Sequence, residues 1–187
     1  MTQDFSDKTF SRRGLMVGLG AASLTIGSGV SPTMAATAAL PKGVKMVDYD
    51  NPKYTPGTIL ISNSKRRLLL VHEGGKAMRY PVAVGKPSEQ WTGMLPVTNK
   101  VVGPVWYPTP SMREKNPSLP KYVKAGPKNP MGTHAIYLGW TFYRIHGTNS
   151  PGSIGRAASS GCFRMYNSHV KDLYARVHFG APCYVTA

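Results

Sequence analysis

Glycine and proline break this chain into short pieces, and their spacing limits the folds that it can adopt. The 187 residues include 20 glycines and 16 prolines, and seven of the prolines lie between Pro104 and Pro130. Proline removes a backbone hydrogen bond from a helix interior or a central strand, and both residue types favour turns. The pattern predicts a mainly β domain, a β-sandwich or meander with one or two short helices. It also predicts a long irregular segment at 104–130, which we interpret as an insertion over a functional site.

Apolar runs between these breakers predict the strands. The runs at 58–62 and 67–72 flank the turn Asn63-Ser64-Lys65, which is typical of a hairpin. A run at 77–84 alternates between apolar and other residues, so the three runs together indicate an antiparallel meander. Later runs predict a pair of strands within 91–102 and single strands at 134–138, 141–145 and 183–186.

Two short helices are predicted in the last third of the chain. Ser150-Pro151 is a typical helix start, with a serine cap and a proline at the first helical position. Asn167 or Ser168 is expected to cap the second helix, and Gly180 to end it. One face of that helix is apolar, with Val170, Leu173, Tyr174 and Val177 at helical spacing.

The first 38 residues read as an export signal. Arg12-Arg13 precede a weakly apolar, glycine-rich stretch, and Ala36-Thr37-Ala38 offers a small-residue cleavage site. The paired arginines indicate a twin-arginine signal, with an ordinary secretory leader or an uncleaved anchor as alternatives. The apolar stretch is short, so no transmembrane span is expected in the mature form. We therefore expect residues 1–38 to be a signal, 39–56 a lead-in segment and 57–187 one catalytic domain, placed in the periplasm or cell envelope.

The chain is strongly basic, with a formal net charge of +15. Such a surface attracts polyanions by long-range Coulomb forces. The sequence has no zinc-finger spacing, no aromatic RNA-binding strand motif and no basic heptad region, so nucleic acid is not a predicted partner. A solvated basic surface without a specific ligand fits the same composition.

The two cysteines differ in their surroundings. Cys183 lies in a strand-like run, where alternation turns it inward as a small apolar side chain. Cys162 lies beside Gly161 among serine and arginine, a setting typical of a reactive thiol. We expect no disulfide between them.

His146 and Cys162 form a candidate catalytic pair. His146 ends a predicted strand, and Cys162 follows sixteen residues later. A thiol needs a base to become an attacking thiolate, and histidine can accept and return a proton at neutral pH. Gly161 leaves room for a substrate near the backbone N–H groups, which can stabilise a developing oxyanion. A cysteine and a histidine in one stretch are often unrelated, so this pattern alone leaves the pair a hypothesis.

Two short motifs strengthen the hypothesis. The run His146-Gly147-Thr148-Asn149, followed by Ser159-Ser160-Gly161-Cys162-Phe163-Arg164-Met165, resembles the signature of the L,D-transpeptidase family with a YkuD-type catalytic domain. The segments 126–132 and 58–62 are similar to that family as well, and the similarity extends over roughly residues 55–187.

The resemblance implies roles for individual residues. Cys162 would be the nucleophile, His146 the base, and the Gly147 carbonyl the third member that holds the imidazole. Arg164 would pair with a substrate carboxylate, with a structural salt bridge as the alternative. Some family members have histidine where this chain has Ser160, which concerns fine positioning. The remaining candidates for substrate binding or loop shaping are Ser159, Ser160, Gly161 and Asn149.

The resemblance also implies the reaction. Peptidoglycan stem peptides would be joined by 3→3 cross-links through a thioester acyl-enzyme, without a cofactor or metal, and carbapenems would acylate the thiol. The other histidines lack metal-ligand spacing, so no metal site is predicted. Three alternatives remain: attachment of an outer-membrane protein to peptidoglycan, hydrolysis of the stem, and a non-catalytic basic module that binds wall or lipid.

Overall fold

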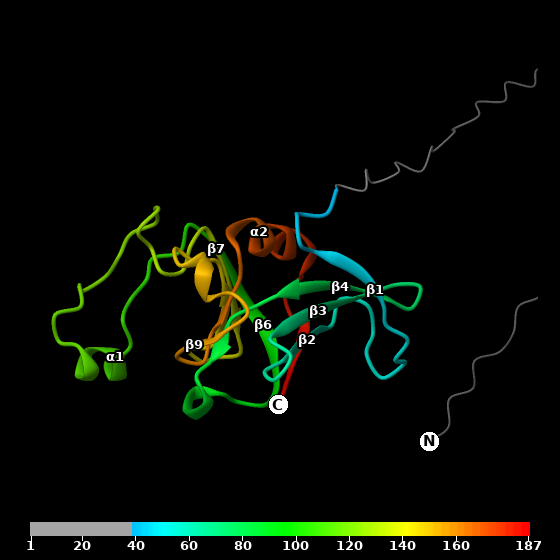
Figure 1. Ribbon diagram of the computed structural model, residues 1–187, viewed down its shortest axis with the longest axis horizontal. Helices are drawn as coiled ribbons and strands as arrows, with labels where there is room; N and C mark the ends of the chain where they lie inside the picture. Colours follow the sequence, from blue (N-terminus) through cyan, green and yellow to red (C-terminus); the bar gives the residue numbers. More distant parts are fainter. Residues whose placement is uncertain (1–38) are drawn as a thin grey trace, which may run out of the picture. The chain divides into compact units, whose positions relative to one another are not determined.

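The computed structural model describes residues 39–187 (Figure 1). The predicted export signal at 1–38 lies outside the described residues. Two α-helices occur among the described residues, α1 (Pro110–Lys115) and α2 (Asn167–Arg176), with 3-10 turns η1 (Pro87–Glu89) and η2 (Pro151–Ser153). None of these helices is long and apolar enough to cross a bilayer. The strands are β1 (Lys45–Asp48), β2 (Ile59–Ser62), β3 (Arg67–His72), β4 (Lys76–Pro81), β5 (Val84–Gly85), β6 (Gly93–Val102), β7 (His134–Leu138), β8 (Arg144–His146), β9 (Ala157–Ser159), β10 (Phe163–Arg164) and β11 (Pro182–Thr186).

Nine strands form one curled sheet in the order β1-β4-β3-β2-β11-β6-β7-β8-β10. The predicted meander is confirmed, because β2, β3 and β4 pair antiparallel in sequence order. Strand β11 lies parallel to β2 and antiparallel to β6. It therefore occupies the centre of the sheet, between these two strands. The remaining strands β5 and β9 form a separate parallel pair.

The segment 91–102 is one strand, not the predicted pair. Its first half, from Gly93 to Pro96, pairs with β11, and its second half pairs with β7. The pairing register shifts between Val97 and Asn99, which bends the strand where it passes from one partner to the other. We predicted two strands because the run is long for a single one, but β6 uses its length to join both halves of the sheet.

The lead-in segment contains an edge strand that the sequence did not predict. Strand β1 pairs antiparallel with β4, from Lys45 opposite Arg79 to Asp48 opposite Lys76. Only Val47 in β1 is even half-buried. A strand with so little burial has no hydrophobic alternation, which is the signal that strand prediction uses.

Both predicted helices are present, but their ends differ from the prediction: α2 ends at Arg176 with Val177 as its C-cap, not at Gly180. Ser150-Pro151 starts a single 3-10 turn, and the serine side chain makes no capping bond. Tyr166 occupies the N-cap of α2, and the predicted cap Asn167 is its first residue. The predicted apolar face packs into the core, with Val170, Leu173 and Val177 buried. Helix α1 was missed, although Thr109 caps it and Pro110 begins it.

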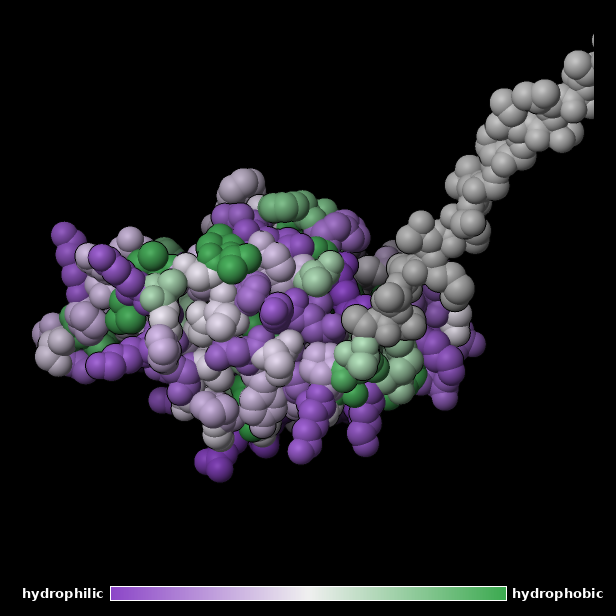
Figure 2. Space-filling model, turned by 90° about the horizontal axis from the view of Figure 1, so that it is seen from above, coloured by the Kyte–Doolittle hydropathy of each residue, from purple (hydrophilic) through white to green (hydrophobic). Residues whose placement is uncertain are grey.

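Side chains from both halves of the sheet and from α2 form one core. Its largest fully buried members include Tyr80, Phe163 and Ile59. The outside is mainly hydrophilic on the face shown in Figure 2, where hydrophobic residues form small separate groups. This burial gives the rigid scaffold on which the loops around β8 and β10 are held.

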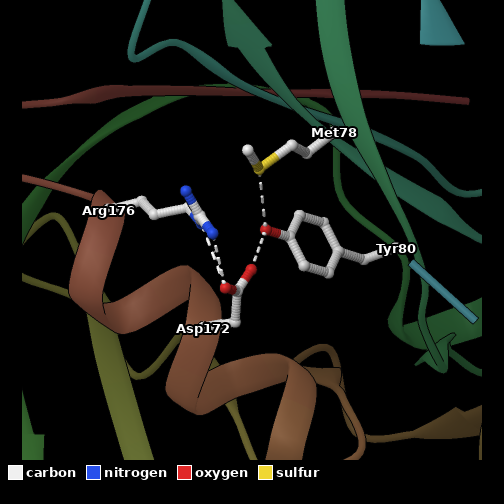
Figure 3. A network of polar contacts seen from close by, with 4 residues as sticks. All are labelled: Met78, Tyr80, Asp172 and Arg176. Atoms are coloured by element: carbon white, nitrogen blue, oxygen red, sulfur yellow. Dashed lines mark hydrogen bonds and ion pairs between the residues drawn. The ribbon is translucent and has the colours of Figure 1, made fainter. Parts of the chain in front are cut away.

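A polar network fastens α2 to the sheet (Figure 3). The Tyr80 hydroxyl on β4 donates to Asp172 Oδ2 at 2.7 Å, and Arg176 Nη2 donates to Asp172 Oδ1 at 2.8 Å. Burial and the bond to Asp172 raise the pKa of Tyr80, so its hydroxyl stays a donor at all ordinary pH values. The network therefore joins a buried phenol to a carboxylate that an arginine already neutralises.

Replacing Tyr80 with phenylalanine is expected to lower the free energy of unfolding by about 1–2 kcal/mol, because it removes one buried hydrogen bond to a charged acceptor. Urea denaturation followed by circular dichroism measures the loss. Tyr122→Phe is the matched control, since Tyr122 is 44% exposed. Equal stability of the two variants would contradict a stabilising role for the network.

Candidate active site

A cavity of about 130 Å³ lies where β8 and β10 end. These two strands are parallel neighbours, with Ile145 opposite Phe163 and His146 opposite Arg164. The cavity brings together five of the predicted site residues, namely His146, Ser159, Ser160, Cys162 and Arg164. The proline-rich segment contributes Trp106, Tyr107, Thr109, Met112 and Pro130 to its lining, in agreement with the predicted insertion over the site.

His146 is buried and held by its backbone neighbour. Its Nδ1 donates to the Gly147 carbonyl at 2.6 Å, the partner that the family resemblance implied. This bond fixes the tautomer in which the other ring nitrogen carries a lone pair. Burial lowers the pKa of His146 to about 4; the Gly147 bond opposes that shift, and the charges of Arg164 and Arg144 add to it. The imidazole is therefore a neutral base at pH 7.

Cys162 is a free thiol that is partly open to solvent. Its S–H donates to the Phe142 carbonyl at 3.4 Å. Burial raises the pKa of the Cys162 thiol, while the nearby arginines, above all Arg144, act in the opposite direction. The thiol and the imidazole line the same cavity, but within residues 39–187 no hydrogen bond joins them, and the thiol proton is given to Phe142 instead. Cys183 is also free and fully buried in β11, which is the arrangement predicted for it.

The turn that carries Cys162 is fixed from both sides. Ser159 Oγ donates to the Cys162 carbonyl at 2.5 Å. Gly161 has a positive φ of 102°, and its carbonyl accepts from Trp91 Nε1 at 3.2 Å. Ser159 and Gly161 thus shape the turn, and Ser160 is the exposed residue between them that lines the cavity.

Arg164 has no acidic partner in the described part of the chain. The three ion pairs between residues 39 and 187 are Lys76–Asp48, Lys115–Glu89 and Arg176–Asp172. The alternative of a structural salt bridge is therefore not realised there. Arg164 lines the cavity next to His146 with its charge uncompensated, which suits a site for a carboxylate.

Asn149 lies outside this cavity. Its side chain is exposed, and Nδ2 donates to the Lys128 carbonyl at 2.9 Å. It lines a separate hollow with residues such as Val102 and Pro127. Of the two roles expected for Asn149, loop shaping fits this position and contact at the cavity does not.

Asn167 is a positioning residue that the sequence assigned only to helix capping. Its Oδ1 accepts from Thr148 N at 3.1 Å and from Thr133 N at 3.3 Å, and its Nδ2 donates to Thr148 O at 3.2 Å. Thr148 follows Gly147 directly, so these bonds hold the loop whose carbonyl orients His146. Asn167 is far from Thr133 and Thr148 in the sequence, so local sequence patterns could not reveal this role.

Gly132 makes that arrangement sterically possible. A Cβ at this position would lie inside the contact distance of Asn167 Oδ1, and the Gly147 carbonyl carbon would be only 2.6 Å away. Its φ is +63°, a conformation that other residues rarely adopt. The chain can pass this close to the His146 loop only without a side chain.

Gly132→Ala is therefore expected to destabilise the protein by about 3 kcal/mol or more, through overpacking and strain at positive φ. Thermal unfolding measures this effect. Gly152→Ala is the control, because its Cβ meets nothing within 4 Å. If Gly132→Ala were as stable as Gly152→Ala, the loop could accommodate a Cβ at position 132, and the packing argument would be wrong.

Comparison with known proteins agrees with the motifs. Residues 56–185 match the YkuD family of L,D-transpeptidase catalytic domains. A probable L,D-transpeptidase, YbiS, from Escherichia coli is 35% identical over 154 residues, which are 75% of this chain and 49% of that protein. The chain spans about half the length of the curated relatives that it matches first.

Two solved structures are similar to this chain. A protein from Brucella melitensis, described as a probable carnitine operon oxidoreductase, is 41% identical, with a TM-score of 0.53, over 75% of this chain and 92% of that chain. L,D-transpeptidase 3 from Mycobacterium tuberculosis, in complex with a faropenem-derived adduct, is 16% identical, with a TM-score of 0.52, over 70% of this chain and 60% of that chain. The second likeness is one of fold alone.

Proposed function

Because the chain belongs to the L,D-transpeptidase family, with a YkuD catalytic domain over residues 56–185, we propose that it forms 3→3 cross-links between peptidoglycan stem peptides. The observation that carries the proposal is the cavity in which a free thiol, a neutral imidazole and an uncompensated guanidinium meet. In a chain of this family, these are the groups that acyl transfer from a peptide with a free carboxylate requires.

The proposed first half-reaction forms a thioester. The Cys162 proton passes to the free nitrogen of His146, and the sulfur attacks the carbonyl at the L-centre of the third stem residue. Backbone N–H groups of the turn at Gly161 and Cys162 face the oxyanion. The bond to the terminal D-alanine breaks, and the departing amine takes the proton from His146. Arg164 pairs with a carboxylate of the stem throughout.

The second half-reaction regenerates the thiol. The side-chain amine of a second stem attacks the thioester, its proton passes to His146, and the sulfur leaves as a thiolate that is then reprotonated. The resting enzyme has no hydrogen bond between thiol and imidazole, and such bonds often form only when substrate is bound. The bond from Nδ1 to the Gly147 carbonyl keeps the other ring nitrogen free to accept a proton in both halves.

The cavity is small for this substrate. Ligand sites of drug size usually measure about 300–1,000 Å³, whereas the space around Cys162 is about 130 Å³. We therefore infer that the proline-rich segment, through Trp106, Tyr107 and Met112, moves outward to admit a stem peptide. We also propose that residues 1–38 direct export, since peptidoglycan lies outside the cytoplasmic membrane.

The description of the Brucella relative as an oxidoreductase concerns that protein, and nothing in this cavity favours that activity over acyl transfer. Product analysis tests the choice. The purified protein is incubated with a tetrapeptide-bearing disaccharide and the products are separated by mass spectrometry. We expect a dimer that has lost one D-alanine, with fragment ions of a 3→3 link. Only a shortened monomer would indicate hydrolysis, and no change in mass would contradict the proposed function.

A further inference from the structure

Arg144 lies beside the candidate nucleophile and has no role in the mechanism above. It begins β8 two residues before His146, and it lines the same cavity. Its guanidinium is held over the ring of Tyr137, with its carbon 4.9 Å from the ring centroid. Nη1 donates to the Phe142 carbonyl at 2.8 Å, and Nε is buried without a partner. These contacts fix the position of the positive charge of Arg144.

That place is next to the sulfur. The Phe142 carbonyl that accepts from Arg144 also accepts the S–H of Cys162, at 3.4 Å. Two groups bonded to one oxygen lie within roughly 6 Å of each other, the range in which an opposite charge strongly favours an ionised group. No carboxylate between residues 39 and 187 forms an ion pair with Arg144, so its charge is available to the sulfur.

His146 cannot supply this charge in the resting state. The buried imidazole is neutral at pH 7 and becomes a cation only after it has taken the thiol proton. The other charged or titratable groups that line the cavity are Arg164 from β10 and the phenols of Tyr107 and Tyr143. Arg164 lies opposite His146 in the strand pairing and is assigned to the substrate, which leaves Arg144 for the sulfur.

We propose that Arg144 holds the thiolate of Cys162 in its reactive state. When the thiol proton passes to His146, the sulfur loses its bond to the Phe142 carbonyl, and the guanidinium that shares that carbonyl donates to the sulfur instead. Arg144 thus stabilises the thiolate that forms when His146 takes the proton, and no imidazolium is needed in advance. This role rests on the proposed function of Cys162 as nucleophile.

The test measures the reactivity of the thiol without any wall substrate. The pH dependence of alkylation by iodoacetamide is followed by mass spectrometry of the full chain, with the label mapped to Cys162. In Arg144→Gln we expect the alkylation midpoint to rise by about one pH unit and the rate at pH 8 to fall about tenfold. Arg144→Lys, which keeps the charge, should retain most of the wild-type rate. Arg156→Gln is the control, because Arg156 is exposed and does not line the cavity.

Arg144→Met provides a second neutral variant, since its unbranched stem can still pack on Tyr137 if Arg144→Gln fails to fold. Circular dichroism reports folding in each case. A profile of either folded neutral variant that coincides with the wild type would overturn the role of Arg144 alone. A wild-type Cys162 that resists alkylation up to pH 10 would overturn both this role and the proposed function.

Discussion

Cys162→Ala is expected to abolish covalent chemistry at the cavity. The variant should lose at least about 10⁴-fold in kcat/KM for stem peptides, because acyl transfer through a thioester has no substitute for the nucleophile. It should also fail to gain mass on exposure to a carbapenem, whereas the wild type gains one drug molecule. The intact protein, analysed by mass spectrometry before and after exposure, gives both answers in one experiment.

Cys183→Ala is the matched control for this prediction. Cys183 is fully buried in the core, and it does not line the cavity. Loss of that sulfur leaves a small void that costs about 1–2 kcal/mol of stability, while the adduct on Cys162 forms as before. Wall chemistry that survives Cys162→Ala would instead support the alternative of a basic binding module, in which the fold is kept and the cavity is not catalytic.

The sequence predicted the parts of this site that are close together along the chain. His146, Gly147 and Cys162 lie in one stretch, and the bond from His146 to the Gly147 carbonyl joins neighbouring residues. The strands of the meander were also predicted, since their apolar residues form short runs or alternate with other residues. In these cases the local pattern and the tertiary packing favour the same structure.

The features that were missed depend on distant partners. Asn167 reads locally as a helix cap, yet its amide bonds to Thr133 and Thr148 on other elements. Arg144 reads as an ordinary polar residue of a strand, and only the fold brings it to the carbonyl that Cys162 also uses. Strand β1 is paired without being buried, so its hydrogen bonds to β4 leave no mark in the hydrophobic pattern.

His146→Gln is expected to produce the second large loss of activity and a change in acid stability. Glutamine can still donate to the Gly147 carbonyl, but it cannot accept the thiol proton. Loss of a positioned base costs about 10²–10⁴-fold in acylation rate. Acylation by a carbapenem, followed in a stopped-flow instrument at pH 7, measures this effect. A rate close to that of the wild type would mean that another group takes the proton.

The stability effect follows from the same burial. In the unfolded chain His146 binds a proton near its ordinary pKa of 6.5, whereas in the fold burial lowers its pKa to about 4. Between these values the unfolded state binds more protons, so stability is complete above pH 6.5 and falls as the pH decreases towards 4. The loss attributable to His146 is about 3 kcal/mol, and in His146→Gln it should be absent from the difference between pH 7 and pH 4. The exposed His72 provides the control, since His72→Gln should leave the acid loss unchanged. Equal acid sensitivity of the wild type and His146→Gln would show that the imidazole is not held neutral by the fold. The proposed mechanism would then have no explanation for a neutral base at position 146.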